Sequence, residues 1–536
     1  MANNIFDSLP AINIERSSMR LDHSLATTFN AGKLVPIYWT DVMPGDTVKA
    51  DINSIIRMAT PLHPVMDNCF LDIHCFFVPN RLVWKHWVNL MGENTTDAWS
   101  EPEEYQIPQW RVIPKPGSLA DYLGLPTMFD QEMEVSALPA RAYSLIWNEW
   151  YRDQNLQDPQ LVSLDDTTDQ PASHGLLPVN RYKDYFSSCL PQPQKGAPVA
   201  LALGSLAPVY TKSDMSVNVT DPLKLANTSG EGFGILIPRD LGVVGLDSNT
   251  ATLTSFPADS NQVIGNSTGS VAPKNLFADL SEVSSVTVNA LRQAFAVQRL
   301  LEADMYGTRY RELVLSHFRV HTGDARVQVP EYLGGKHIPI NVQQVIQQSS
   351  TADEPTVLGN TGAFSKTVDS DHYFTKSFTE HGIFMVLASV RVSHSYQQGI
   401  PRKFSRKGRY DFYWPELAHI GNTPVFTKEL YSNVDPDQVF GYQEAWSEYR
   451  YEPNRVSGDM RSGINGSLDV WHYADDYQSV PYLSASWMAE GDELIGRTLA
   501  VRDSDLSDQF IANFYFDFTF VRPMPIHSVP GLTGHF

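Results

Sequence analysis

Cysteine is scarce in this chain: Cys69, Cys75 and Cys189 are the only three among 536 residues. So few thiols exclude the disulfide framework that stabilises many secreted domains. In one extended strand Cys69 and Cys75 would lie roughly 20 Å apart, at about 3.3 Å per residue, which is too far for a disulfide. The cysteine content is therefore typical of a protein that assembles in a reducing cytoplasm.

Long hydrophobic runs are absent as well. No stretch of about 18 consecutive apolar residues occurs, and the opening residues MANNIFDSLPAINIERSS lack the basic start and apolar run of a signal peptide. The sequence predicts neither membrane insertion nor secretion by a signal peptide. With 42% hydrophobic and 19% charged residues, the chain is long enough for several domains, or for one domain with large insertions.

Positively charged residues are fewer than negatively charged ones. Lys and Arg number 40 against 61 Asp and Glu, which gives a net charge of −21 at neutral pH. Proteins that bind nucleic acid over a broad face need cations distributed over that face. The charge balance argues against a general nucleic-acid binder, so any contact with nucleic acid must be local.

Motifs for cofactors and catalysis are also missing. The chain has neither the phosphate-binding G-x-x-x-x-G-K-[ST] pattern nor the zinc-binding H-E-x-x-H pattern. In a strand His74 would point away from Cys75, and the run Asp503, Asp505 and Asp508 lacks the glycine and the final glutamate of a calcium loop. We expect no metal, no cofactor and no catalytic residue. A β-sandwich glycoside hydrolase, which needs two carboxyl groups about 5 to 9 Å apart in a cleft, stays open as the alternative.

Hydrophobic residues predict three long strands. CFLDIHCFFVP (69–79) alternates and indicates a half-buried strand, and FIANFYFDFTFVR (510–522) places four phenylalanines at period two before Pro523. GIFMVLASVRVSHSY (382–396) is rich in β-branched and aromatic residues and indicates a buried strand. Because these segments are far apart in the sequence, their pairing must be non-local, as in a mainly β sandwich.

Two segments predict helices that decorate the β core. The first begins near Pro139, and its apolar face is formed by Tyr143, Ile146, Trp147 and Trp150. The second ends near Gly307, and its repeating positions are Leu291, Phe295, Gln298, Leu301 and Met305. Residues 196–285 differ from the rest, since 34 of these 90 residues are Gly, Ser, Thr or Asn; we interpret them as an exposed insertion or subdomain.

One short stretch runs against the overall charge. In PRKFSRKGRYDFYWP (401–415), five of the eight residues from 402 to 409 are basic, and four aromatic residues follow. Cations that follow a backbone and rings that stack bases suit single-stranded nucleic acid. The candidate contact residues are Arg402, Lys403, Arg406, Lys407, Arg409 and Tyr410. A solvated loop or a contact between subunits is the alternative, and alternation predicts that Phe412 and Trp414 anchor a strand in the core.

Several blocks along the chain share a pattern with one family. They are TTFNAGKLVPIYWTDVMPGDT (27–47), RMATPLHPVMDN (57–68), FFVPNRLVWKHWVNLMGE (76–93), NEWYRDQNL (148–156), DARVQVPEYLGG (324–335), SYQQGIPRKFSRKGRYDFYWPELAHIG (395–421), VFGYQEAWSEYRYEPNRVSGDMRS (439–462) and RPMPIHSVPGLTGHF (522–536). The chain resembles the major capsid protein of gokushoviruses, which are small tailless bacteriophages of the Microviridae with circular single-stranded DNA. Gly534 departs from the family, which more often has an acidic residue there.

The resemblance implies an eight-stranded jelly-roll β-sandwich of the viral capsid type, with long loop insertions and a few helices. Residues 1–195 and 286–536 would form the two parts of the jelly-roll domain. Residues 196–285 would form a surface insertion that builds a protrusion at each threefold axis of a T=1 icosahedral shell. Asn249, Asn261 and Asn266 are the candidate residues of a host-attachment loop within it.

The implied function is structural: a virion protein that self-assembles around the phage genome, with assembly in the bacterial host cytoplasm. Its partners would be further copies of the chain, the single-stranded DNA genome, a small basic DNA-binding phage protein and a bacterial surface receptor. Many acidic copies cannot neutralise an enclosed genome, so the basic protein or free cations should supply most of the counter-charge.

Overall fold

The structure is a computed structural model of the chain. It describes residues 15–94, 104–197, 199, 288–304, 310–319, 328–348, 358–501 and 506–527, and the backbone of short strands between 209 and 278. The chain divides into two compact units, Met1–Pro193 with Tyr306–Phe536 and, separately, Gln194–Met305. The domain boundaries expected from the sequence stay a prediction.

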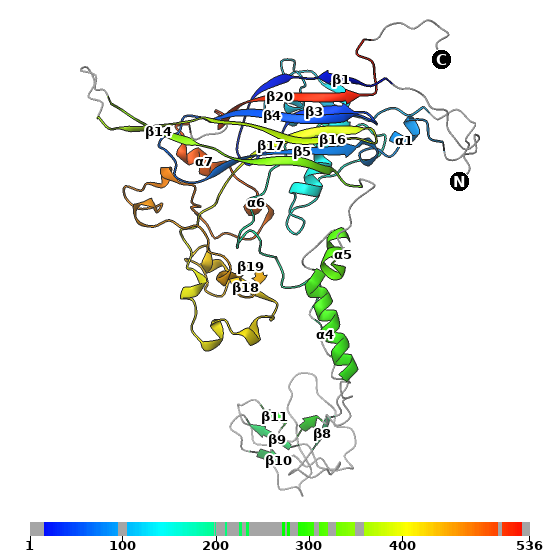
Figure 1. Cartoon of the computed structure of the whole chain (residues 1–536). Coiled ribbons are helices and arrows are strands. Elements are labelled where there is room, and N and C mark those ends of the chain that lie inside the picture. Colours follow the sequence, from blue (N-terminus) through cyan, green and yellow to red (C-terminus); the bar gives the residue numbers. More distant parts are fainter. Residues whose placement is uncertain are drawn as a thin grey trace. The chain divides into compact units, whose positions relative to one another are not determined.

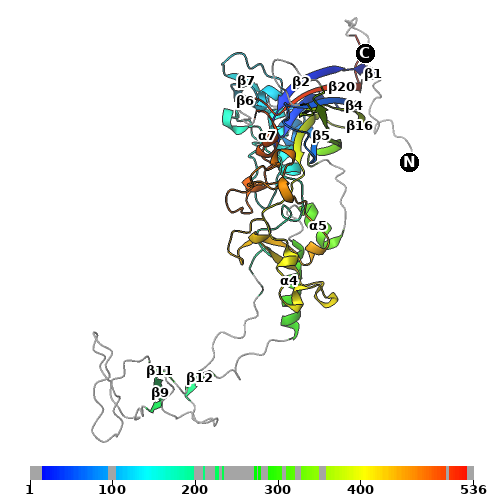
Figure 2. The same cartoon turned by 90° about the vertical axis from the view of Figure 1, so that its left-hand side faces the viewer.

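The larger sheet of the first unit contains strands from both the N-terminal and the C-terminal part of the chain. Its strands are β1 (Ser17–Arg20), β2 (His23–Phe29), β20 (Phe510–Arg522), β4 (Thr47–Met58) and β16 (Thr367–Ser377). β1 and β2 both pair with β20, which pairs with β4, and β4 pairs with β16, all antiparallel. Figure 1 and Figure 2 show these strands side by side. The alternation predicted for 510–522 is confirmed, because every second side chain of β20 is buried, down to Phe520.

The smaller sheet has four strands in the order β13-β5-β17-β3, again antiparallel. These strands are β3 (Val35–Val42), β5 (Cys69–Pro79), β13 (Glu331–Pro339) and β17 (Gly382–Val392). The buried strand predicted within 382–396 is confirmed as β17, which places ten of its eleven residues in the interior.

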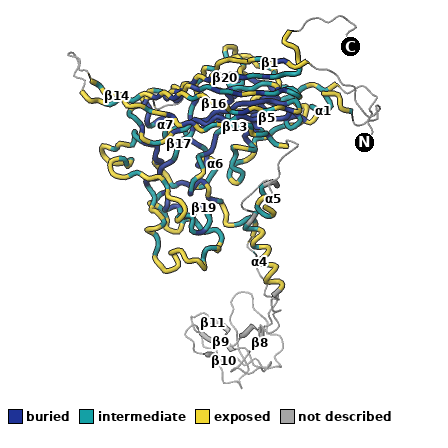
Figure 3. The backbone as a smooth tube through the Cα atoms, viewed as in Figure 1, coloured by how far each residue is buried: buried dark blue, intermediate teal, exposed yellow. Residues whose placement is uncertain are grey.

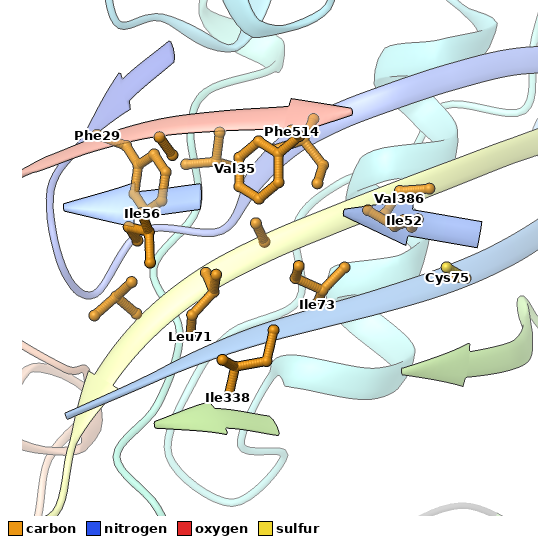
Figure 4. Packing of buried hydrophobic residues seen from close by; sticks show 14 of the residues in the cluster. Phe29, Val35, Ile52, Ile56, Leu71, Ile73, Cys75, Ile338, Val386 and Phe514 are labelled. Atoms are coloured by element: carbon orange, nitrogen blue, oxygen red, sulfur yellow. The ribbon is translucent and has the colours of Figure 1, made fainter. Parts of the chain in front are cut away.

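Side chains of both sheets meet in one hydrophobic core. Phe514 and Ile52 of the larger sheet belong to the same buried cluster as Leu71, Ile73 and Val386 of the smaller one (Figure 4). The strands form the most deeply buried part of the chain, whereas the connecting loops are largely exposed (Figure 3). The mainly β class is therefore confirmed, and the count of eight jelly-roll strands stays a prediction.

β5 differs from its expected half-buried state, since both of its faces are covered. Asp72 on the second face is buried and is compensated there: its carboxylate accepts hydrogen bonds from Arg391 and Tyr182 and pairs with His337. The predicted separation of His74 from the thiols is confirmed, because His74 contacts Tyr151 while Cys75 lies in the core between the sheets. A polar residue in a strand can thus be buried when its partners come from distant segments.

A second hydrophobic cluster lies on that other face of the smaller sheet. It packs α3 (Leu138–Ile146), with Tyr143 and Ile146, against Phe76 of β5 and Met385 of β17. The predicted first helix is confirmed. The apolar face predicted for it is wrong at the C-terminal end of the helix. Trp147–Tyr151 form a π-helical turn, which has more residues per turn than an α-helix, and Trp150 is 43% exposed.

The remaining elements of the first unit are short. Before β13 they are α1 (Trp87–Leu90), β6 (Gln109–Val112), α2 (Leu119–Tyr122), β7 (Met133–Ser136) and α5 (Tyr310–Phe318). After β13 they are the β14 (Val342–Ile346) and β15 (Thr361–Ser365) hairpin, β18 (Asn422–Phe426), β19 (Val439–Glu444), α6 (Ala485–Met488) and α7 (Glu493–Thr498).

The second unit contains α4 (Val288–Ala303) and the strands β8 (Val209–Thr211), β9 (Lys224–Asn227), β10 (Gly232–Gly234), β11 (Val271–Pro273) and β12 (Leu276–Ala278). The second predicted helix is confirmed as α4, while Met305 and Gly307 lie outside the described residues. Among the residues that the structure describes, no helix has the length and apolarity needed to cross a membrane.

Candidate nucleic-acid interface

The basic stretch forms a chain of tight turns and not a strand. Three 3₁₀ turns, Arg402–Phe404, Arg409–Asp411 and Pro415–Leu417, follow one another. The carboxylate of Asp411 accepts hydrogen bonds from the backbone N–H groups of Lys407 and Gly408, each at 2.7 Å. A short polar side chain that binds the preceding backbone favours a turn over a strand.

The predicted burial of Phe412 and Trp414 is therefore wrong. Phe412 is 52% exposed and Trp414 is 37% exposed, and the indole N–H of Trp414 donates to the carbonyl of Arg409 at 3.1 Å. Tyr410, at 73%, is more exposed than either. Aromatic residues that follow cations here face outward, which leaves their rings available for contact.

Arg402 is paired with carboxylates of the same chain. Its guanidinium lies 3.8 Å from carboxylate oxygens of both Glu429 and Glu448, and it donates to the carbonyl of Pro424 at 2.9 Å. Glu429 is buried, and this burial raises its pKa even though Arg402 acts in the opposite direction. Arg402 thus compensates an acidic group in the interior and is not a free cation.

Two more of the candidate cations have carboxylate partners. The ammonium of Lys403 lies 3.0 Å from Glu452, and the guanidinium of Arg406 lies 3.5 Å from Glu448. Arg406 also stacks over the ring of Tyr449, with 4.4 Å from its central carbon to the ring centroid. These contacts tie the stretch to the segment 444–452, a pairing across more than 40 residues that charge counting along the sequence missed.

Lys407 and Arg409 differ from the other three. Within the described part of the chain neither has a carboxylate within ion-pair distance, and Arg409 stacks on Trp414 with 4.6 Å between its central carbon and the ring centroid. Arg409 and Lys407 are both exposed. Of the six residues expected at this site, the fold therefore leaves Lys407, Arg409 and Tyr410 free to meet a ligand.

Two hollows flank the stretch. One, of about 320 Å³, is lined by Arg406, Tyr410 and Trp446; the other, of about 650 Å³, is lined by Lys403, Phe404 and Tyr451. Arg402, Arg406 and Glu448 border both. Aromatic rings and a few cations thus surround both hollows, and the carboxylates of Glu429 and Glu448 also line them.

The remaining expected site residues are the three asparagines of the host-attachment loop. Asn249, Asn261 and Asn266 lie outside the described residues. In the ranges that the structure does describe, no group of His, Cys, Asp and Glu side chains is arranged to hold a metal ion. All three cysteines are free and buried.

Known proteins match this chain over nearly its whole length. The family model described as capsid protein (F protein) matches residues 8–532. The chain belongs to this family of phage capsid proteins. This capsid protein is similar to the capsid protein VP1 of Spiroplasma virus 4, with 39% identity over 554 aligned residues that cover 98% of the chain and 97% of that protein.

Two further relatives support the gokushovirus resemblance. The capsid protein VP1 of Chlamydia phage 1 is 36% identical over 99% of the chain and 98% of its own length. The capsid protein VP1 of Bdellovibrio phage phiMH2K is 37% identical over the same shares. Family membership over nearly the full length favours a structural role over the glycoside hydrolase alternative.

Proposed function

We propose that this capsid protein is the major shell subunit of a phage, and that its copies close into a T=1 icosahedral particle around a circular single-stranded DNA genome. The observation that carries the proposal is the family match over residues 8–532, together with relatives aligned over nearly their whole length. A two-sheet sandwich with a continuous core supplies the rigid body that shell building needs.

Electron microscopy of the purified protein tests this proposal. Expression with the phage's partner proteins should give uniform small icosahedra, with at least the roughly 1,600 Å² of buried surface that is typical of specific interfaces. A particle of another symmetry would contradict the T=1 arrangement. A monomer under all these conditions, above all one that hydrolyses oligosaccharides, would favour the glycoside hydrolase alternative.

The basic stretch contributes to genome contact through its free members. Lys407 and Arg409 bind phosphate, and Tyr410 offers a ring to a base, whereas Arg402, Lys403 and Arg406 stabilise the loop. Two cations per subunit are few beside the net charge of −21, so a small basic DNA-binding phage protein or free cations provide most of the counter-charge.

Residues 196–285 form a protrusion at the threefold axes that meets a bacterial surface receptor, with Asn249, Asn261 and Asn266 in its attachment loop. The support is compositional, since this region is rich in small polar residues. Shortening it around 249–269 should leave particles intact and alter host attachment. The subunits assemble in the host cytoplasm, and particles that fail to form after the trimming would contradict the surface role.

A further inference from the structure

A separate hollow of about 580 Å³ lies on the face of the smaller sheet that is turned away from the core between the sheets. Its lining comes from distant parts of the chain: Phe76 of β5, Trp150 and Arg152 beside the π-helical turn, Arg181, and Tyr332 of β13. It shares no lining residue with the two hollows around the basic stretch. Its volume is within the range of small-molecule sites, about 300 to 1,000 Å³.

Three aromatic rings form one wall of this hollow. Phe76 is buried at its base, and Trp150 and Tyr332 are each 43% exposed above it. The ring centroids of these three residues lie 5.6 to 5.7 Å apart, and the indole N–H of Trp150 donates to the carbonyl of Pro330 at 2.9 Å. The two exposed rings are thus held in place and can stack on a flat group.

Two arginines also line the hollow. Arg181 is paired with Asp475 at 3.0 Å. Arg152 donates through Nη1 to the carbonyl of Gln157 at 2.8 Å and, among the residues that the structure describes, has no carboxylate within ion-pair distance. A phosphate oxygen is an acceptor that guanidinium groups bind well, so Arg152 is the cation of this hollow best suited to bind one.

The backbone of β13 is shaped to admit the rings. A β-bulge between Tyr332 and Gly334 sets Tyr332 opposite Phe76, on the same face as His74. A Cβ atom on Gly335 would lie 2.5 Å from the His74 ring and 2.6 Å from the Tyr332 hydroxyl. Glycine at this position therefore leaves the space in which the two side chains lie, which is a common reason for glycine inside a strand.

We propose that this hollow binds one unpaired nucleotide of single-stranded DNA, with the base on Trp150 and Tyr332 and a phosphate on Arg152. Exposed rings together with an arginine that has no carboxylate partner match the two chemical halves of a nucleotide. Lys183 also lines the hollow, but its ammonium is paired with Asp153 at 2.7 Å. The proposal rests on the proposed function only in its choice of single-stranded DNA.

Binding of a short oligothymidylate to the purified subunit tests the proposal. Trp150→Ala and Tyr332→Ala should each weaken binding roughly 5-fold or more, because a stacked base contributes about 1 to 3 kcal/mol, and Trp150→Phe should restore most of it. Arg152→Gln should flatten the log-log salt dependence by about 0.7. An oligonucleotide carrying a photoreactive iodouracil should cross-link to Trp150 or Tyr332.

Tyr515→Ala is the matched control, since it removes a ring of 42% exposure from a strand of the other sheet. It should leave oligothymidylate binding unchanged, and thermal unfolding should show that every variant is folded. Unchanged binding by Trp150→Ala and Tyr332→Ala, or cross-links only elsewhere, would overturn the proposal. If a neutral oligosaccharide quenched the fluorescence of Trp150 and the oligonucleotide did not, the proposal would be overturned as well. These results are independent of shell formation, which microscopy measures separately.

Discussion

The basic stretch concentrates five cations in eight residues, whereas the Trp150 hollow gathers its cations from Arg152, Arg181, Lys183 and Arg391. In the stretch, three of the five cations have carboxylates from 429–452 as partners. In the hollow, Arg181, Lys183 and Arg391 are paired as well, with Asp475, Asp153 and Asp72, and among the described residues only Arg152 of the four lacks a carboxylate partner. Folding thus pairs most cations with carboxylates in both places, and it leaves Lys407 and Arg409 without such a partner in the stretch and Arg152 in the hollow. A cluster of charges in the sequence therefore does not by itself identify the cations that stay available for a ligand.

A rise in pH should destabilise the fold through His394, which lies next to Arg181 of the hollow. Arg181 shares Asp475 with His394, which is buried between Asp475 and Glu490. Burial lowers the pKa of His394, but the two carboxylates outweigh it and raise this pKa to about 9. Protonated His394 therefore stabilises the fold fully below pH 6.5, and this stabilisation, on the order of 3 kcal/mol, is lost as the pH rises through about 9.

Chemical denaturation at a series of pH values measures this effect. The free energy of unfolding should fall between pH 6.5 and pH 9, and His394→Gln should remove most of the fall. An equal fall in the variant would show that another group is responsible.

Removal of Arg402 should destabilise the protein, whereas removal of the exposed Lys407 should not. Arg402→Gln leaves Glu429 buried without its cation, at a cost of about 2 kcal/mol in the free energy of unfolding. Lys407→Gln, the matched change at an exposed position, should cost less than about 0.5 kcal/mol. Thermal unfolding compares the two, and equal losses would mean that Arg402 is as dispensable as Lys407.

Gly335→Ala should weaken binding at the hollow and also lower the stability of the fold. The added methyl group would crowd His74, the Tyr332 hydroxyl and, at 2.7 Å, the backbone carbonyl of Ile73, at a cost of about 1 to 3 kcal/mol, and Tyr332 would move away from Trp150. We expect weaker oligonucleotide binding with unchanged binding at the basic stretch. Gly408→Ala is the control there, because a Cβ at Gly408 would meet only Asp411, at 3.8 Å. If Gly335→Ala bound the oligonucleotide as well as the unchanged protein does, Tyr332 would not contribute to the site.

Periodicity in the sequence was enough to locate three of the sheet strands and both predicted helices. The phenylalanines of β20 and the apolar run of β17 specify their own burial. The second face of β5 could not be foreseen, since Asp72 is buried only because Arg391, Tyr182 and His337 reach it from far along the chain. Neither the hollow lined by Arg152 nor the exposure of Trp150, which lies in a π-helical turn, was predicted from the sequence. The paired glycines at 334 and 335 were the available signal for an irregular strand beside the hollow.

The salt dependence of single-stranded DNA binding tests most directly whether the fold leaves only Lys407 and Arg409 free in the basic stretch. Two double variants remove the same charge: Lys407→Gln with Arg409→Gln, and Lys403→Gln with Arg406→Gln. Each phosphate contact contributes about 0.7 to the log-log slope, so the first variant should flatten the slope by about 1.4 and the second should leave it unchanged. Equal flattening by both variants would show instead that Lys403 and Arg406 leave their ion pairs with Glu452 and Glu448 and bind phosphate too.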